Sequence, residues 1–347
     1  MSRSSARSRP PSRHRVSRIL VGLSLATSLV LAGCSGSSDD PADEAPNGQN
    51  TAEGATLSGR WPLTGLAAEG AVPQHPVMVV KIDNTSSSSP QIGLRRADLV
   101  TEELVEGGST RLAVFYYSQV PATVGPLRSF RATDIGIVSP VEAVLVGSGG
   151  AGPTVRRLRE AKVKTITEAS QSPGYYRDSG RTAPYNLFMK LPELAKTLKS
   201  PGAPANYFPW GAEEDFPSGR KATGLAAQFS AAQTTNWRFR GGRYVNANSN
   251  APDSAQFEPS TVLVLRVRVG DAGYLDPAGN PVPETKFTGK GEALVFHGGK
   301  VVRGTWSKAG LGAALALRTK AGELTLPPGK VWLELVPVNG GNVTISK

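Results

Sequence analysis

The most regular pattern of apolar and polar positions along the chain lies in Ala97–Arg131. Two β-like runs, Leu99–Val105 and Arg111–Ser118, flank the pair Gly107-Gly108, which is typical of two strands joined by a glycine turn. Charged residues stand in and around these runs where apolar ones are expected, namely Asp98, Glu102, Glu103, Glu106, Arg111, Arg128 and Arg131. We interpret this stretch as a site rather than as packing alone.

The surrounding pattern predicts an α/β domain over residues 58–200. A buried strand is expected at Val77–Ile82, ending at Asp83-Asn84. Farther on, a strand, a glycine loop, a helix and another strand form a βαβ unit, which implies a parallel pair in a mixed sheet. The segments are Glu142–Val146, Gly147–Gly152, Thr154–Ala161 and Val163–Thr167, with further helices expected at Ser129–Ile137 and from near Pro192.

A Pro- and Gly-rich linker at 201–222 leads to a β-rich domain at 223–347. The chain has 39 Gly and 27 Pro, a composition that favours turns and short strands. Turns at Gly298-Gly299 and Ala321-Gly322 predict hairpins, so we expect a mainly-β antiparallel C-terminal domain, as a sandwich or small barrel. The predicted strands are Leu225–Phe229, Asn236–Phe239, Thr261–Val269, Ala293–His297, Lys300–Thr305, Ala314–Arg318 and Val331–Val336.

The N-terminal segment indicates export. An arginine-rich start precedes the apolar run Ile19–Ala32, which is short for a membrane span. Leu31-Ala32-Gly33-Cys34 resembles the bacterial lipobox, in which the thiol receives a diacylglyceryl group. We therefore predict a lipoprotein signal peptide at 1–33, lipidation at Cys34, a disordered tether at 34–57, and anchoring to the outer face of the cytoplasmic membrane. A lipidated lone cysteine leaves no thiol for catalysis.

Net charge indicates the kind of partner. The chain carries +11, and the part that follows the arginine-rich leader and the acidic tether stays strongly basic. A basic body suits an anionic partner, such as phospholipid headgroups or an envelope polymer. We expect no nucleic-acid partner, because nucleic-acid-binding motifs are missing and the chain carries an export signal.

Several segments resemble the YerB-type bacterial lipoprotein family. The resemblance covers most of the chain from Trp61 onward, is specific in the first domain and is looser in the second, where Asn246–Glu258 departs from the pattern. It implies an envelope lipoprotein with two domains that carry no established biochemical activity. The segments are KIDNTSSSSPQIGLRRADLVTEELVEGGSTRLAVFYYS, GPLRSFRATD, RTAPYNLF, VFHGGKVVRGTWSK and TLPPGKVWLELVP.

Gly147–Gly152 matches the dinucleotide-binding pattern G-x-G-x-x-G, with Glu168 near the spacing of a ribose-binding acid. Export, the position of this unit within its domain and the family resemblance all argue against a nicotinamide site. A helix start that holds a phosphate or carboxylate is a second interpretation. We favour a third, a tight glycine turn, and expect no cofactor.

Asp98, Glu102 and Glu106 are separated by even numbers of residues, so on a strand they would share one face. Such a face can bind a cation or perform acid/base chemistry. We favour pairing of these acids with nearby arginines, because structural ion pairs are commoner than catalytic dyads. The predicted ligand-binding set is Arg111, Arg128, Arg131, Asp83 and Asn84, in which Arg128 and Arg131 can clamp a phosphate or carboxylate.

Histidines are scarce. Beyond the leader only His75 and His297 remain, which makes a Ser-His-Asp triad improbable and a multi-histidine zinc site unavailable, so we expect no metal. We expect His75 to be a polar cap and His297 an exposed turn residue. Trp306 and Trp332 fall at strand positions and are predicted to be core residues.

Two functions follow from these observations. The first is a surface-anchored binding or scaffold module, which holds an anionic envelope polymer or a protein partner through Arg111, Arg128 and Arg131. The alternative is a carboxylate-dependent hydrolase of envelope glycan that uses Asp98, Glu102 or Glu106. We favour binding, because the charge excess is positive and no catalytic signature is complete.

Overall fold

A computed structural model describes residues 59–68, 71–200 and 202–347. The chain divides into two units, Met1–Ala45 and Pro46–Lys347, and every element below belongs to the second. The predicted signal peptide, Cys34 and the tether lie outside the described residues.

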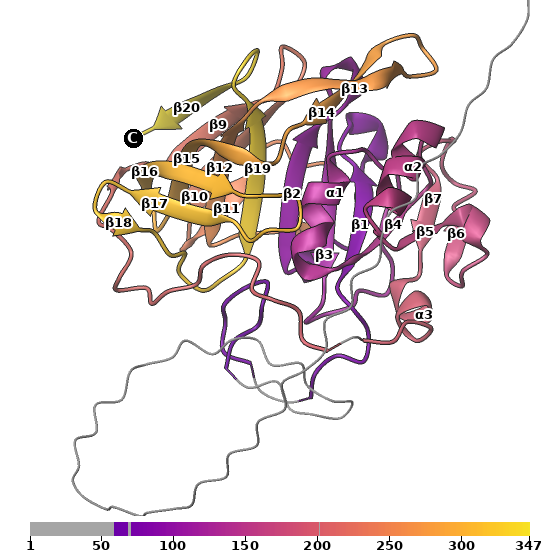
Figure 1. The fold of residues 1–347 in the computed structure, drawn as a ribbon, viewed down its shortest axis with the longest axis horizontal. Helices are drawn as coiled ribbons and strands as arrows, with labels where there is room; N and C mark the ends of the chain where they lie inside the picture. Colours follow the sequence, from indigo (N-terminus) through magenta and orange to yellow (C-terminus); the bar gives the residue numbers. More distant parts are fainter. Residues whose placement is uncertain (1–58, 69–70, 201) are drawn as a thin grey trace, which may run out of the picture. The chain divides into compact units, whose positions relative to one another are not determined.

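A twelve-stranded sheet runs through both halves of the second unit (Figure 1). Its strand order is β18-β17-β16-β15-β12-β19-β2-β3-β1-β4-β5, and β8 pairs with β16. The strands are β1 Met78–Asp83, β2 Leu99–Leu104, β3 Thr110–Tyr116, β4 Val144–Gly147, β5 Thr165–Thr167, β8 Arg220–Lys221, β12 Thr261–Val267, β15 Gly289–His297, β16 Lys300–Lys308, β17 Ala316–Thr319, β18 Gly322–Glu323 and β19 Val331–Pro337.

Smaller sheets and short helices complete the unit. A four-stranded sheet has the order β11-β10-β9-β20, and β13–β14 and β6–β7 form two-stranded ribbons. These strands are β6 Tyr175–Arg177, β7 Leu187–Met189, β9 Gly224–Gln228, β10 Thr234–Arg240, β11 Arg243–Asn246, β13 Val269–Leu275, β14 Pro281–Thr285 and β20 Asn342–Ser346. The α-helices are α1 Asp134–Val138, α2 Gly152–Glu160 and α3 Leu191–Ala195, and 3₁₀ turns lie at Ser86–Ser88, Leu94–Arg96, Glu106–Gly108, Ser139–Val141, Glu168–Ser170 and Asp253–Ala255.

The predicted fold class is confirmed. The N-terminal half has a mixed sheet with helices, and β4, α2 and β5 form the predicted βαβ unit with β4 parallel to β5. The C-terminal half is rich in antiparallel strands, apart from the parallel pair β12–β19. The two halves meet where β19 pairs in parallel with β2, so the sheet is continuous across the predicted linker. Every residue of β19 is buried, because the strand has a neighbour on each side and both faces of the sheet are covered there.

One predicted helix is shorter than expected. Ser129–Ile137 was predicted to be helical, but helix α1 begins only at Asp134. The preceding segment instead forms backbone hydrogen bonds with β1 and with the glycine loop, in which the Arg128 N–H donates to the Lys81 carbonyl and the Phe130 N–H to the Gly149 carbonyl. Backbone groups committed to those partners cannot form helical hydrogen bonds.

Eight strands of the large sheet run in one direction, namely β18, β16, β12, β19, β2, β1, β4 and β5. Their C-terminal ends therefore lie along one side of the sheet, which we call the carboxyl edge. In open sheets with parallel strands, ligands commonly bind at this side.

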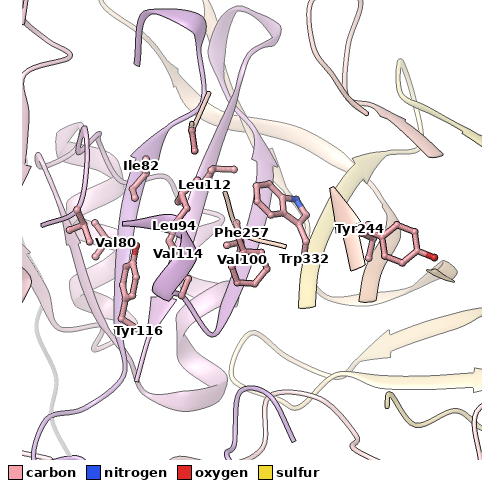
Figure 2. Close-up of a cluster of buried hydrophobic side chains, with 14 of the residues drawn as sticks. Val80, Ile82, Leu94, Val100, Leu112, Val114, Tyr116, Tyr244, Phe257 and Trp332 are labelled. Atoms are coloured by element: carbon pink, nitrogen blue, oxygen red, sulfur yellow. The ribbon is translucent and has the colours of Figure 1, made fainter. Parts of the chain in front are cut away.

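Apolar side chains form a core on each face of the sheet. One core combines residues of β1–β3 with the four-stranded sheet, and Figure 2 shows Val100 and Val114 in the same cluster as Trp332 and Tyr244. The ring centroids of Trp237 and Trp332 lie 5.0 Å apart in an edge-on arrangement. Trp306 and Trp332 are 2% and 3% exposed, which confirms them as core residues.

The segment within the predicted linker also packs on the sheet. Tyr207 and Phe208 are buried in the second core, and the Tyr207 hydroxyl donates to the Ile137 carbonyl at 3.0 Å. None of the helices in the described residues combines the length and apolar character that crossing a membrane requires.

Candidate functional site at the carboxyl edge

Charged residues concentrate at the carboxyl edge of β1 and β2, beside the start of β3. Strand register sets Asp83 and Glu103 on either side of Arg111. Because side chains alternate between the faces of a sheet, these three residues and Lys81 share one face. Glu102 lies on the other.

On the first face, Lys81 forms a fully buried ion-pair network with Glu103 and Asp134. Its Nζ contacts a carboxylate oxygen of Glu103 and lies 2.7 Å from Asp134 Oδ1, and all three side chains are inaccessible to solvent. Burial raises the pKa of Glu103, while the Lys81 charge acts in the opposite direction. Asp134 Oδ2 also accepts the Arg131 N–H at 2.7 Å, which fixes the start of α1.

Arg111, Arg128 and Arg131 converge beside this network, and we call them the arginine cluster. Glu106 Oε2 lies 2.6 Å from Arg131 Nη2 and 3.9 Å from Arg111 Nη2, while Asp83 Oδ2 lies 3.3 Å from Arg128 Nε. Together with the Lys81 network, four cations face four carboxylates. Burial lowers the pKa of Arg111 to about 10, with the Arg131 charge acting in the same direction.

The structure thus brings the predicted arginines together and pairs Glu106 with them, as expected. Arg111 and Arg131 are only 7% and 8% exposed. Three of the cluster's buried guanidinium nitrogens have no hydrogen-bond acceptor among the described residues, namely Arg111 Nε, Arg128 Nη1 and Arg131 Nε. A ligand-binding role for the cluster stays a prediction.

The expectation that Asp98, Glu102 and Glu106 share one face is wrong. Asp98 precedes β2 and accepts hydrogen bonds from the Tyr117 and Ser118 N–H groups, at 2.7 and 2.9 Å. Glu106 lies beyond the strand, in a turn where Gly107 has a φ of 68°, and it reaches the face opposite Glu102. The even spacing failed because the strand ends at Leu104, and alternation ends with it.

Glu102 forms a buried carboxyl pair with Glu334. The β2–β19 register sets them directly opposite each other, and both are fully buried. Burial raises the pKa of Glu102, and burial together with the Glu102 charge raises that of Glu334 much further. Of the two carboxyl groups, Glu334 therefore holds a proton more tightly than Glu102 does. Trp237 Nε1 donates to Glu334 Oε1 at 2.7 Å.

Polar side chains surround the Glu102 carboxylate and extend from it to the surface. It accepts hydrogen bonds from Thr110 Oγ1 at 2.7 Å, Thr235 Oγ1 at 2.9 Å and Asn84 Nδ2 at 3.0 Å. Beside it lies a cavity of about 380 Å³, which we call the carboxamide pocket. Its lining is Asn84, Thr85, Ser86, Ser109, Ala232, Gln233, Thr235, Asn246, Asn248 and Asn250.

A larger hollow, of about 690 Å³, lies where β12 and β16 end and β15 begins. We call it the basic hollow, because its lining holds five cations and no carboxylate: Arg266, Arg268, Lys286, Lys290 and Lys308. Trp306 forms part of its wall and donates from Nε1 to the Arg266 carbonyl at 3.1 Å. Burial lowers the pKa of Lys308 to about 8. Sequence reasoning missed this site, although Arg266-Val267-Arg268 signals it at a strand end.

The chain matches two family models, described as the N-terminal and C-terminal domains of the protein of unknown function DUF3048, over residues 63–203 and 225–333. The chain belongs to this family. A relative named "Putative lipoprotein YerB", from Bacillus subtilis, is 23% identical over 290 residues, which are 80% of this chain and 86% of the relative. The crystal structure of YerB from Bacillus subtilis matches with a TM-score of 0.68 at 20% identity, over 82% of this chain and 99% of that one, and shares the fold.

The linings of the two cavities are distributed differently over the two matched ranges. With the exception of Val338, every residue that lines the basic hollow falls within the matched C-terminal range. The carboxamide pocket draws residues from both ranges, because Asn84–Ser86 and Ser109 face Ala232–Asn250.

The glycine loop Gly147–Gly152 has the geometry of a tight turn. A Cβ at Gly147 would lie 2.6 Å from the Arg128 carbonyl oxygen, so only glycine lets the loop approach that segment. Glu168 pairs with Arg177 at 2.6 Å rather than standing free at the loop. Both observations favour the turn interpretation.

The expectation for His297 is wrong. It is 8% exposed, with Nδ1 2.8 Å from Thr261 Oγ1 and Nε2 2.8 Å from Glu213 Oε1. The hairpin turn that follows it is exposed, but register places His297 opposite Thr261 on a central strand. His75 Nδ1 lies 2.9 Å from the Pro76 carbonyl oxygen.

Proposed function

We propose that this chain is an envelope lipoprotein that binds an anionic envelope polymer at the basic hollow. The lipobox-like sequence at Cys34 and the lipoprotein name of its Bacillus relative support attachment to the outer face of the cytoplasmic membrane. The net charge of +11 supports an anionic ligand. The observation that carries the proposal is a hollow with five cations in its lining.

The basic hollow suits this ligand better than the arginine cluster does. Each guanidinium of the cluster has a carboxylate within 4 Å, and the cluster is mostly buried. In the hollow, Arg268, Lys286 and Lys290 are exposed, and of these three Lys286 pairs with a carboxylate, that of Glu284 at 2.8 Å. Arg268 and Lys290 make no ion pair within the described residues, and exposed cations without matched acids attract polyanions.

Hydrolysis of glycan by paired carboxylates has less support. Such enzymes need two carboxyl groups that flank a sugar with room for the substrate between them. Asp98 is engaged by backbone N–H groups, Glu106 by arginines, and Glu102 is fully buried under its hydrogen-bond donors. The hydrolase alternative predicted from the sequence would require these carboxyl groups to leave their present hydrogen bonds and ion pairs.

The proposal is tested by titrating the full chain with inorganic polyphosphate and with purified anionic wall polymer. Arg268→Gln with Lys290→Gln should weaken binding about 30-fold, since each lost cation near a polyanion costs about 1 kcal/mol. Binding by the native chain should weaken steeply with added salt.

A matched double variant, Arg159→Gln with Lys320→Gln, removes the same charge at exposed positions outside the lining and should bind nearly as well. Equal losses in both double variants would show a general charge effect and contradict the assignment. A loss confined to Arg128→Gln would move the site to the arginine cluster.

A further inference from the structure

We infer that the carboxamide pocket is a second binding site, for an uncharged, hydroxyl-rich ligand of the sugar class. This inference is independent of polymer binding at the basic hollow, because the two linings share no residue.

The composition of the lining indicates the chemistry of the ligand. Nine of the ten lining residues are polar and uncharged, and five of these are carboxamides: Asn84, Gln233, Asn246, Asn248 and Asn250. A carboxamide offers donors and an acceptor on one rigid group, and a sugar hydroxyl likewise donates and accepts. A volume of about 380 Å³ lies in the range of small-molecule sites.

The buried Glu102 carboxylate orients part of this lining from below. It accepts hydrogen bonds from Asn84 Nδ2 at 3.0 Å, Gln233 Nε2 at 3.3 Å and Thr235 Oγ1 at 2.9 Å. Side chains held in this way lose little conformational freedom when a ligand binds. Glu102 is therefore a positioning residue, shielded from the ligand by the groups it holds.

Several polar atoms of the lining stay available. Within the described residues, Asn246 Nδ2, Gln233 Oε1 and Ser86 Oγ make no hydrogen bond to protein. They comprise a donor, an acceptor and a hydroxyl, which is the mixture that a polyhydroxyl ligand satisfies.

Other classes of ligand fit less well. The lining has no cation to balance an anion, and the buried Glu102 carboxyl group lies beneath it. An extended peptide needs pockets for its side chains, but Ala232 is the single apolar residue of the lining. An uncharged sugar avoids both conflicts.

The pocket is built across the β2–β19 junction. Ser230 Oγ donates to the Gly108 carbonyl at 2.6 Å, and Asn250 Nδ2 donates to the Asn84 carbonyl at 3.0 Å. These contacts hold the walls from the two halves in place, so neither half alone provides the site.

The test measures binding of a soluble N-acetylglucosamine tetramer to the full chain by calorimetry, with tetraglycine as the peptide probe. Asn246→Asp replaces the available donor while keeping the oxygen that accepts the Asn248 N–H at 3.0 Å. We expect Asn246→Asp to weaken tetramer binding about 10-fold. Ser86 is exposed, so Ser86→Ala should leave the fold intact, and we expect it to weaken tetramer binding about 3-fold.

Gln119→Ala is the matched control, because Gln119 is an exposed amide bonded to Arg96 outside the lining, and binding should be unchanged. Three results would overturn the inference: no binding of the tetramer, tighter binding of tetraglycine, or unchanged affinity in both pocket variants. Because the two linings share no residue and the tetramer carries no charge, failure of tetramer binding would not affect the interpretation of the polyphosphate titration.

Discussion

Replacing Glu334 by glutamine should remove part of the pH dependence of the free energy of unfolding. The Glu334 pKa lies well above its usual value of 4.5, because the group is buried and faces the charged Glu102. The folded chain therefore binds a proton that the unfolded chain releases above about pH 4.5. Stability from this group is fully present below that pH and is lost as pH rises toward the folded pKa.

The size of the effect follows from linkage. One retained proton lowers the free energy of unfolding by about 1.4 kcal/mol for each pH unit within that window. Glutamine reproduces the protonated acid, because its oxygen can accept from Trp237 Nε1 and its amide can donate to Glu102. As pH rises through this window, the free energy of unfolding of Glu334→Gln should therefore increase relative to that of the native chain by about 1.4 kcal/mol for each pH unit.

Urea unfolding at pH 5, 6, 7 and 8 measures this difference. Glu292→Gln is the matched control, since Glu292 lies on β15 of the same sheet, with an exposed side chain paired to Arg303. Its free energy of unfolding should differ from that of the native chain by no more than about 0.5 kcal/mol at each pH. If the free energies of unfolding of Glu334→Gln and of the native chain change in parallel with pH, the Glu102–Glu334 pair holds no extra proton and the reasoning is refuted.

Two further predictions concern the buried network and the glycine loop. Lys81→Met should destabilise the fold by about 3–5 kcal/mol in urea, because Glu103 and Asp134 would remain buried without their cation, whereas the exposed Lys190→Met should change stability by less than about 0.5 kcal/mol. A loss below about 1 kcal/mol for Lys81→Met would argue that the network is not needed. Gly147→Ala should lower stability by about 1–3 kcal/mol through its clash with the Arg128 carbonyl, while Gly152→Ala, with open space around its Cβ, should not. Equal melting temperatures for these two alanine variants would contradict the tight-turn interpretation.

Local patterns in the sequence determined most of the elements. The β-like runs around Gly107-Gly108 predicted β2 and β3, the strand–glycine loop–helix–strand pattern predicted α2, and the Gly298-Gly299 pair predicted the β15–β16 hairpin. Each depends on neighbours within a few residues, so the chain's own order carries the information. The resemblance of separated segments to one family likewise required no coordinates.

Only the tertiary structure decided the partners. The opposition of Glu102 and Glu334 depends on β2 pairing with β19, and no local pattern specifies which distant strand becomes a neighbour. The same is true of His297, whose burial comes from Thr261 and Glu213, and of the arginine cluster, whose charge is balanced by Asp83 and Glu106. Sequence reveals which side chains carry charge, whereas their pKa values and accessibility depend on what folding places beside them.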